Sequence, residues 1–280
     1  MRVRLWGTRG SLAAPGAETA RYGGNTACVE VRGPEGTVLV LDAGTGIRPL
    51  GRSLAGTVRR VHLLLTHLHM DHIQGLGFFA PLLDPDVETH LWGPASTMLD
   101  LRGRLVRYLS PPLFPVHLRD LPRLVLHDLS PGVFDVGEFL VLAELVCHPG
   151  PTVGYRIATD RAALAYLPDH EPALGVPHFP FRADWTSGYA LGRGVDLLIH
   201  DAQYSSAEYR ARVGWGHSAL EHTLAFARLA QVRHLVTFHH DPEHTDDDVD
   251  RLTAEATAAA PLPFAVSPGA EGAVYDVGAS

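Results

Sequence analysis

Short runs of apolar residues, each bounded by glycine, proline or polar residues, recur along most of the chain. Runs of about four to eight residues with alternating or continuous apolar positions are typical of β-strands. The continuous run VHLLLT at residues 61–66 is typical of a strand that is buried on both faces. The pattern predicts strands at residues 3–6, 27–31, 37–42, 61–66, 133–136, 139–146, 153–159, 162–167, 195–200 and 232–239.

Helical patterns lie between these strands. One short helix is predicted at residues 73–83, and another at 95–109 with Pro94 at its start, because proline fits the first turn of a helix. Residues 168–194 are rich in proline, glycine and aromatic residues, and we expect them to form a long loop. Loops of this length are uncommon and often functional.

The last third of the chain predicts two capped helices. Ser218 and Glu221 have the S-x-x-E spacing of a capping box at the start of a helix that ends near Ala230. Thr245 would cap a helix that runs to about Ala260, with three aspartates in its positive first turn. The strands and helices together indicate an α/β or α+β protein. No linker or short repeat interrupts the pattern, so we expect one domain over residues 1–280.

Composition excludes several classes of protein. The chain has 280 residues, of which 46% are apolar, so a disordered protein is excluded. All 23 cationic residues are arginine, and the net charge of −8 argues against a broad nucleic-acid-binding face. The two cysteines form no disulfide framework, and neither a signal peptide nor a membrane-spanning run is visible. We therefore expect a soluble cytoplasmic protein.

Four metal-binding side chains fall within the segment THLHMDH at residues 66–72, directly after the predicted buried strand. In extended backbone His67 and His69 share a face and could hold one ion. Asp71 and His72 come one turn later and could face a second ion. Imidazole and carboxylate without thiolate suit zinc, manganese or iron. Two such ions would share a hydroxide whose pKa is lowered towards neutrality.

Seventeen histidines are an unusual number, and most are expected to be surface or hydrogen-bonded structural residues. Those without a partner at ligand spacing are His62, His90, His117, His127, His178, His222, His234 and His244.

The THLHMDH segment is similar to the T-H-x-H-x-D-H motif of the metallo-β-lactamase superfamily. Further segments resemble this family in the family's order: LDAGTG at 41–46, CHPGPTVGY at 147–155, YLPD at 166–169 and TFHHDP at 237–242. The resemblance implies an αββα sandwich of two mixed β-sheets flanked by helices. It also implies a metal-dependent hydrolase that uses a hydroxide between two divalent ions, with zinc favoured over manganese or iron.

The resemblance implies a ligand set of seven side chains. One ion would be held by His67, His69 and His148, the second by Asp71, His72 and His239, and both by Asp169. His239 is preferred to His240 because it keeps the family's offset to Pro242. Asp42 is expected to accept a hydrogen bond from a ligating histidine. If its segment is a strand, Cys147 is expected to point into the core, because neighbours on a strand face opposite sides.

Other segments narrow the branch of the family. WGTRGS at 6–11 and RYGGNTAC at 21–28 resemble phosphodiesterase-like members, which are relatives of ribonuclease Z and of cyclic phosphate phosphodiesterases. IHDAQ at 199–203 and WGHS at 215–218 resemble the two catalytic segments of ribonuclease Z, although Asp201 replaces a glutamate and Ala219 a threonine.

By this resemblance Asp201 orients His217, which stabilises the phosphorane or protonates the leaving oxygen. Asp71 is assigned a catalytic role as well as its place among the ligands. His200 is expected to be either a site residue or an ordinary strand histidine.

We therefore expect a phosphodiesterase that acts on small or cyclic phosphodiesters. The chain is acidic and has no long glycine- and lysine-rich arm, so tRNA 3′-processing is the alternative, with nucleic acid as a less favoured partner. A lactonase or thioesterase is a second alternative. A non-catalytic metal protein is a third and less favoured alternative, because structural zinc sites are usually closed and cysteine-rich and this site is neither. No membrane partner is expected, and a homo-oligomer stays open.

Overall fold

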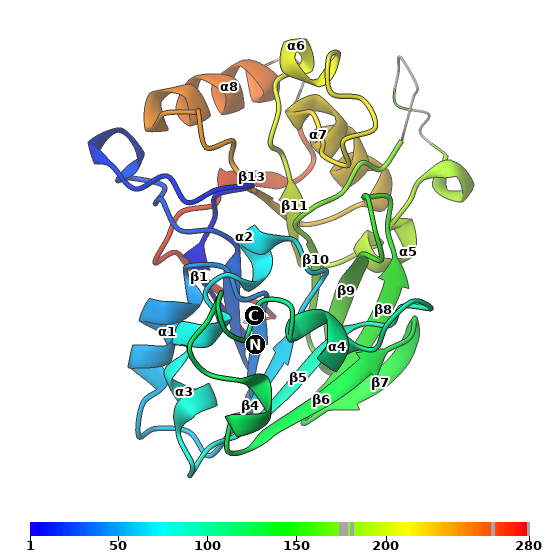
Figure 1. The fold of residues 1–280 in the computed structure, drawn as a ribbon. Coiled ribbons are helices and arrows are strands. Elements are labelled where there is room, and N and C mark those ends of the chain that lie inside the picture. Colours follow the sequence, from blue (N-terminus) through cyan, green and yellow to red (C-terminus); the bar gives the residue numbers. More distant parts are fainter. Residues whose placement is uncertain (174–178, 180–181, 259–260, 279–280) are drawn as a thin grey trace.

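The computed structural model describes residues 1–173, 179, 182–258 and 261–278. Within these residues, two seven-stranded β-sheets pack face to face and helices cover their outer surfaces (Figure 1). The sandwich of two mixed sheets that the family resemblance implied is confirmed. The extent of the domain, residues 1–280, stays a prediction. None of the helices within the described residues has the length and hydropathy of a membrane-spanning segment.

The first sheet is built mainly from the amino-terminal half of the chain. Strands β3 to β6 run parallel to one another, whereas the pairs β14–β1, β1–β2 and β2–β3 are antiparallel. In order across the sheet, its strands are β14 (Val274–Asp276), β1 (Arg2–Gly7), β2 (Cys28–Arg32), β3 (Val38–Leu41), β4 (Arg60–Leu64), β5 (Glu88–Pro94) and β6 (Leu124–Leu129).

The second sheet mirrors this arrangement. Strands β10 to β13 run parallel, whereas β7, β8, β9 and β10 pair antiparallel. In order across the sheet, its strands are β13 (Ala265–Pro268), β12 (His234–Phe238), β11 (Leu197–Asp201), β10 (Ala163–Leu167), β9 (Val153–Ala158), β8 (Phe139–Leu145) and β7 (Gly132–Val136).

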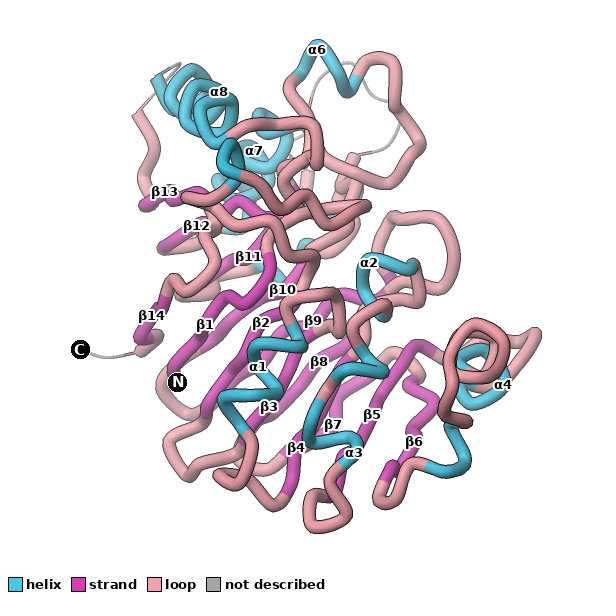
Figure 2. The backbone as a smooth tube through the Cα atoms, turned by 60° about the vertical axis from the view of Figure 1, so that its left-hand side comes forward, coloured by secondary structure: helices cyan, strands magenta, loops and turns pink. Residues whose placement is uncertain are grey.

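Helices cover the outer face of each sheet (Figure 2). The first sheet carries α1 (Ile47–Leu54), α3 (Ala80–Leu83) and α4 (Leu101–Leu105), and the second carries α5 (Tyr189–Gly192), α7 (Leu220–Ala230) and α8 (Asp246–Ala258). A central apolar core between the sheets includes Phe139, Tyr155, Tyr166 and Phe238, all fully buried. Each sheet also has one outer apolar core, which lies between the sheet and the helices that cover it. Each large apolar side chain buried in this way stabilises the fold by about 1.5–3 kcal/mol.

The predicted strands are confirmed to within a residue or two at their ends, but the predicted helix at 95–109 is confirmed only as the shorter helix α4. Residues 88–94 form β5, and Pro94 ends that strand instead of starting a helix. Thr89 and Leu91 are buried while His90 and Trp92 are half-buried, which is the alternation of a strand. Helix α4 starts only after Asp100, whose carboxylate accepts a hydrogen bond from the Gly103 amide.

The helix at 73–83 is divided into three short pieces. These are α2 (Met70–Ile73), a 3-10 turn at Leu76–Phe78, and α3. The long loop at 168–194 also contains structure, namely a 3-10 turn at Ala183–Trp185 and α5. Residues 174–178 and 180–181 of that loop lie outside the described residues.

The capping box at Ser218 is also wrong. Helix α7 begins at Leu220, and the Ser218 hydroxyl donates to the His170 carbonyl oxygen at 2.6 Å instead of capping the helix. The same S-x-x-E spacing does form a capping box at Ser205 and Glu208, where it opens α6 (Ser206–Tyr209). Thr245 caps α8 as predicted, accepting from the Asp248 amide at 3.2 Å. The predicted end of α8, residues 259–260, lies outside the described residues.

Candidate metal centre

The predicted site residues gather at one edge of the sandwich, where several strands end. His67, His69, Asp71 and His72 follow β4 of the first sheet, partly in extended backbone and partly in α2. Strands β8, β10, β11 and β12 of the second sheet all point to the same edge. The loops after these strands carry His148, Asp169 and His239. Both sheets therefore contribute side chains to one cluster.

Two overlapping groups make up this cluster. His67, His69, His148 and Asp169 each offer a nitrogen or oxygen atom within 4.8 Å of the others, and so do Asp71, His72, Asp169 and His239. Asp169 belongs to both groups through different oxygens. Its Oδ2 lies 3.7 Å from His67 Nε2, whereas its Oδ1 lies 2.9 Å from His72 Nε2. The structure thus brings together all seven side chains of the predicted ligand set.

The choice between two adjacent histidines follows from their orientation. His239 Nε2 lies 3.2 Å from Asp71 Oδ2 and 3.3 Å from Asp169 Oδ1. His240 points away and donates from Nε2 to the Gly269 carbonyl oxygen at 2.9 Å. Of the two, His239 is therefore the one whose ring faces the cluster.

The donor set fits divalent cations. Among the described residues, His67 Nε2 is buried without a hydrogen-bond partner, and His72 Nε2 and Asp169 Oδ1 face each other at 2.9 Å without forming a hydrogen bond, although burying an unpaired polar atom is costly. Burial also lowers the pKa of His67, His69 and His148, which keeps these imidazoles in the neutral form that binds metal. Cations bound here would satisfy atoms that otherwise have no partner.

The second ring nitrogen of several histidines is fixed by a hydrogen bond. His72 Nδ1 lies 2.9 Å from Asp42 Oδ2, His148 Nδ1 donates to the Gly216 carbonyl oxygen at 2.8 Å, and His239 Nδ1 donates to Gln203 Oε1 at 3.0 Å. Such contacts set the tautomer and leave each Nε2 lone pair directed at the cluster. The expected contact between Asp42 and a histidine is therefore present.

Asp42 is itself held firmly. Its carboxylate accepts from the Thr66 amide at 2.7 Å and from the Tyr166 hydroxyl at 2.9 Å, and the residue is fully buried. Its φ of 60° lies in the left-handed region, which aspartate and asparagine tolerate better than most residues.

The amino-terminal turn at residues 9–11 packs against the cluster. The Ser11 amide donates to Asp71 Oδ2 at 2.9 Å, and a Cβ atom at Gly10 would lie only 2.3 Å from His239 Nδ1. Arg9 is fully buried and donates to the carbonyl oxygens of Gly23 and His244 at 2.8 and 2.7 Å. In the sequence this turn is only a marker of the family branch, but in the structure it contacts two members of the cluster directly.

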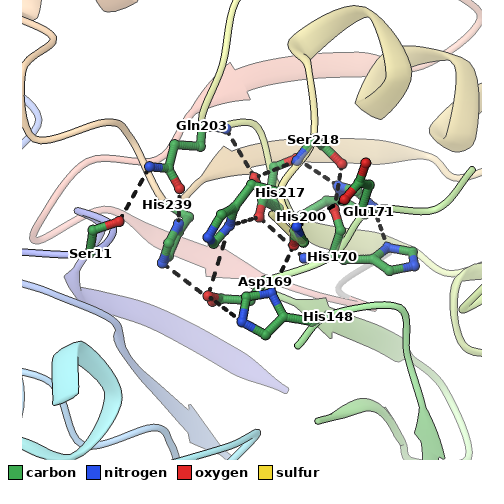
Figure 3. A network of polar contacts seen from close by, with 12 residues as sticks. Ser11, His148, Asp169, His170, Glu171, His200, Gln203, His217, Ser218 and His239 are labelled. Atoms are coloured by element: carbon green, nitrogen blue, oxygen red, sulfur yellow. Dashed lines mark hydrogen bonds and ion pairs between the residues drawn. The ribbon is translucent and has the colours of Figure 1, made fainter. Parts of the chain in front are cut away.

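His217 lies against the cluster and is paired with a carboxylate. Its Nδ1 is 2.7 Å from Asp201 Oδ2, and its ring stacks on His239 with 4.8 Å between ring centroids (Figure 3). Burial alone would lower the pKa of His217, but the Asp201 carboxylate outweighs it and raises the pKa to about 9. Asp201 is fixed in turn by the amides of His170, Gln203 and Ser218, at 3.2, 3.0 and 3.2 Å.

Two buried residues beside Asp169 were missed by the sequence analysis. His170 lies behind the His217–Asp201 pair, with its Nδ1 2.9 Å from His200 Nε2, and His200 Nδ1 donates to the Asp201 carbonyl oxygen. Both ring nitrogens of His200 are therefore engaged within the fold. Glu171 accepts from the Gly216 amide at 2.9 Å and holds the loop that carries His217. No sequence pattern marks either residue, because their hydrogen-bond partners are distant in the sequence and come close only in the folded chain.

Cys147 does not lie in a strand, because β8 ends at Leu145, so the prediction that it points into the core from a strand is wrong. The residue is half-buried and its amide donates to Ser187 Oγ at 2.8 Å. The histidines that were predicted to be structural lie outside the cluster, and His90, for example, contacts His127 and Glu88 at 2.9 and 2.6 Å. His178 lies outside the described residues.

Comparison with known proteins places this site in a family. Residues 37–240 match the family model described as "Beta-lactamase superfamily domain". The chain belongs to the metallo-β-lactamase superfamily. It is 25% identical over 284 residues to ribonuclease Z of Crocosphaera subtropica, covering 85% of this chain and 88% of that protein. It is 27% identical over 260 residues to ribonuclease Z of Thermococcus gammatolerans, covering 76% and 78%.

Members of the superfamily also share the fold. The structure of the metallo-β-lactamase fold protein YhfI from Bacillus subtilis superposes with a TM-score of 0.70 at 18% identity, covering 98% of both chains. The resemblance deduced from the motifs is therefore confirmed. This superfamily member is a metal-dependent hydrolase, and its His/Asp clusters are able to hold metal ions.

Proposed function

We propose that this protein is a phosphodiesterase that hydrolyses small or cyclic phosphodiesters with the help of two divalent cations. Zinc is the first candidate and manganese or iron are alternatives, because imidazole and carboxylate ligands serve all three. When bound, such cations would neutralise charge on the phosphate oxygens and would lower the pKa of a water molecule that serves as nucleophile. They would be held by His67, His69, Asp71, His72, His148, Asp169 and His239.

The observation that carries this proposal is the position of the His217–Asp201 pair. His217 donates from Nδ1 to Asp201 and lies 5.0 Å from the His148 ring, so its Nε2 is left to act on a substrate held at the cluster. As the P–O bond breaks, negative charge collects on the leaving oxygen, and His217 would donate a proton there. Asp201 positions the ring and stabilises its cationic form. A lactone or thioester would not require this pair.

Asp71 lies where it could serve both as a ligand and in catalysis. Its Oδ2 lies between His72 Nε2 at 3.3 Å and His239 Nε2 at 3.2 Å, and it also accepts from the Ser11 amide. The carboxylate is thus oriented from three sides. We propose that it contributes to the ligand set and to the placement of the attacking water.

Leaving-group dependence tests the proposal. Wild-type and His217→Ala proteins loaded with zinc or manganese would be assayed with bis(4-nitrophenyl) phosphate and with a phosphodiester whose leaving group is an aliphatic alcohol. We expect kcat to fall about 10²- to 10⁴-fold for the alcohol leaving group, and much less for 4-nitrophenolate, which departs without a proton. Turnover of a lactone or thioester, with no phosphodiester hydrolysed, would overturn the proposal.

A second candidate is tRNA 3′-processing of the kind that the relatives' name, ribonuclease Z, denotes. Two observations favour it. The similarity to these relatives extends over 88% and 78% of their length, and the chain has the His217–Asp201 pair. The net charge of −8 favours a small substrate instead. Cleavage of a precursor tRNA at the 3′ side, at a rate well above that for bis(4-nitrophenyl) phosphate, would select this candidate.

A further inference from the structure

A cavity of about 550 Å³ opens beside His217, outside the ligand cluster. Its lining includes His217 itself, Tyr204, Arg212, Trp215 and Asp241. The volume lies within the range of roughly 300–1,000 Å³ that is usual for small-ligand sites. Because His217 belongs both to the cavity wall and to the edge of the cluster, a molecule with its phosphate at the cluster would extend its substituent into this cavity.

Trp215 offers an exposed aromatic face at the cavity. Its side chain is 59% exposed, although tryptophan is usually well buried. The loop that carries it is nevertheless fixed, because the amides of Gly214 and Gly216 donate to the Glu171 carboxylate at 3.0 and 2.9 Å. The Tyr209 hydroxyl donates to the same carboxylate at 2.7 Å. An exposed ring on a rigid loop is a suitable platform for stacking a flat ligand.

Arg212 brings a positive charge to the same cavity. Its guanidinium lies over the Tyr204 ring, 5.0 Å from the centroid, and donates to the Glu208 carbonyl oxygen at 3.3 Å. It forms no salt bridge with any residue that the structure describes. Within the same residues the Tyr204 hydroxyl has no hydrogen-bond partner either, although its ring is almost fully buried. Arginine and tyrosine thus offer unused hydrogen-bond donors to a ligand.

Asp241 supplies an acceptor on the cavity wall. Its Oδ1 accepts from the Glu243 amide at 2.9 Å, whereas its Oδ2 has only a long contact of 3.4 Å to Gln203 Nε2. A carboxylate oxygen with spare capacity binds hydroxyl groups such as those of a sugar. A carboxylate in the lining also disfavours a purely anionic ligand, so the cavity is not simply a second phosphate site.

We propose that this cavity binds the nucleoside that is esterified to the scissile phosphate. The base stacks on Trp215, its acceptor atoms receive hydrogen bonds from Arg212 and Tyr204, and the sugar hydroxyls donate to Asp241. This inference rests on the proposed phosphodiesterase function, because it needs the phosphate at the ligand cluster. It narrows the substrate class to nucleoside phosphodiesters.

Calorimetric titration tests the nucleoside site without relying on turnover. The zinc-loaded full chain would be titrated with AMP and with ribose 5-phosphate, which share the sugar phosphate and differ in the base. Because base–aromatic stacking is substantial, we expect AMP to bind about 5- to 150-fold more tightly. Trp215→Ala should remove most of that difference and leave ribose 5-phosphate unchanged, whereas Trp215→Phe should retain it.

A matched control is Trp185→Ala, because Trp185 is also strongly exposed, at 72%, but does not line the cavity. Arg212→Gln should weaken the binding of AMP more than the binding of ribose 5-phosphate. Equal affinities of the wild-type protein for the two ligands, or an equal loss of both in Trp215→Ala, would overturn the inference. Hydrolysis of bis(4-nitrophenyl) phosphate by the same preparation tests the proposed function separately, so the two can fail independently.

Competition identifies the source of the nucleoside. AMP bound to the wild-type protein would be challenged with the dinucleotide adenylyl-adenosine and with a short adenosine-containing RNA. Displacement of AMP by the dinucleotide indicates a small-molecule substrate. Displacement of AMP by the RNA alone indicates that the substrate is the end of an RNA chain. Either result supports a nucleoside site.

Discussion

Replacing Gly10 with alanine would place a methyl group against the ring of His239. The added Cβ would lie 2.3 Å from Nδ1 and 2.5 Å from Cε1, whereas ordinary van der Waals contact begins at 3.4 Å, so the ring and the turn must separate by about 1 Å. Gly10 is held by its amide, which donates to the His240 carbonyl oxygen at 2.9 Å, and by its neighbours in the turn. The ring of His239 is therefore expected to move.

Two costs follow from this movement. Overpacking of a close-packed interior usually costs about 1–3 kcal/mol of folding free energy. A shifted His239 would also stretch its 3.0 Å hydrogen bond to Gln203, and loss of such a supporting contact weakens metal binding about 10- to 100-fold. We expect Gly10→Ala to bind one cation per chain nearly normally and the other about 10- to 100-fold more weakly.

The assay is a zinc titration in the presence of a chromogenic chelator, with the cations per chain measured after dialysis. Gly16→Ala is the control, because its backbone is extended and the nearest atom to an added Cβ is Thr19 Oγ1 at 4.0 Å. If Gly10→Ala kept two cations per chain at wild-type affinity, the turn at residues 9–11 would have no part in positioning His239.

Three further predictions concern other parts of the molecule. Asp42→Asn should weaken cation binding about 10- to 100-fold in the same titration, because His72 loses a charged acceptor at 2.9 Å, and an unchanged affinity would contradict this. Phe139→Ala should lower the free energy of unfolding in urea by about 3–5 kcal/mol, because Phe139 is fully buried between the sheets; a loss below 1 kcal/mol would show that the core collapses around the cavity. Burial, with help from His90 and Arg60, lowers the pKa of His62 from its ordinary 6.5 to about 4. Between pH 4 and 6.5 the unfolded chain therefore binds more protons at this residue than the folded chain, so the free energy of unfolding falls as the pH drops from 6.5 to 4. His62→Asn should make that fall shallower in acid unfolding curves.

The ligand set could be predicted from the sequence because its members are marked by local patterns. The run VHLLLT gives the strand, and the ligands of THLHMDH follow it in extended backbone and one helical turn. His239 could be separated from His240 only by an offset within a motif, whereas the structure shows the difference directly, since His239 faces Asp71 and Asp169 and His240 bonds to the Gly269 carbonyl oxygen.

The supporting residues could not be predicted, because their partners are distant in the chain. Glu171 holds Gly216, which lies 45 positions away, and Ser11 contacts Asp71 over 60 positions. No spacing rule connects such pairs. Local capping patterns fail for a related reason. The S-x-x-E spacing occurs at both Ser205 and Ser218, and only tertiary contacts decide that the Ser218 hydroxyl bonds to His170 instead.

The cluster draws His67, His69, Asp71 and His72 from one sheet and His148, Asp169 and His239 from the other. Any cation held by both sets would therefore act as a non-covalent crosslink between the two halves of the sandwich. Its binding energy would be shared with folding, so that the free energy of unfolding rises with the free cation concentration. By the same reciprocity, a substitution in the central core that lets the sheets move apart would weaken cation affinity without touching a ligand.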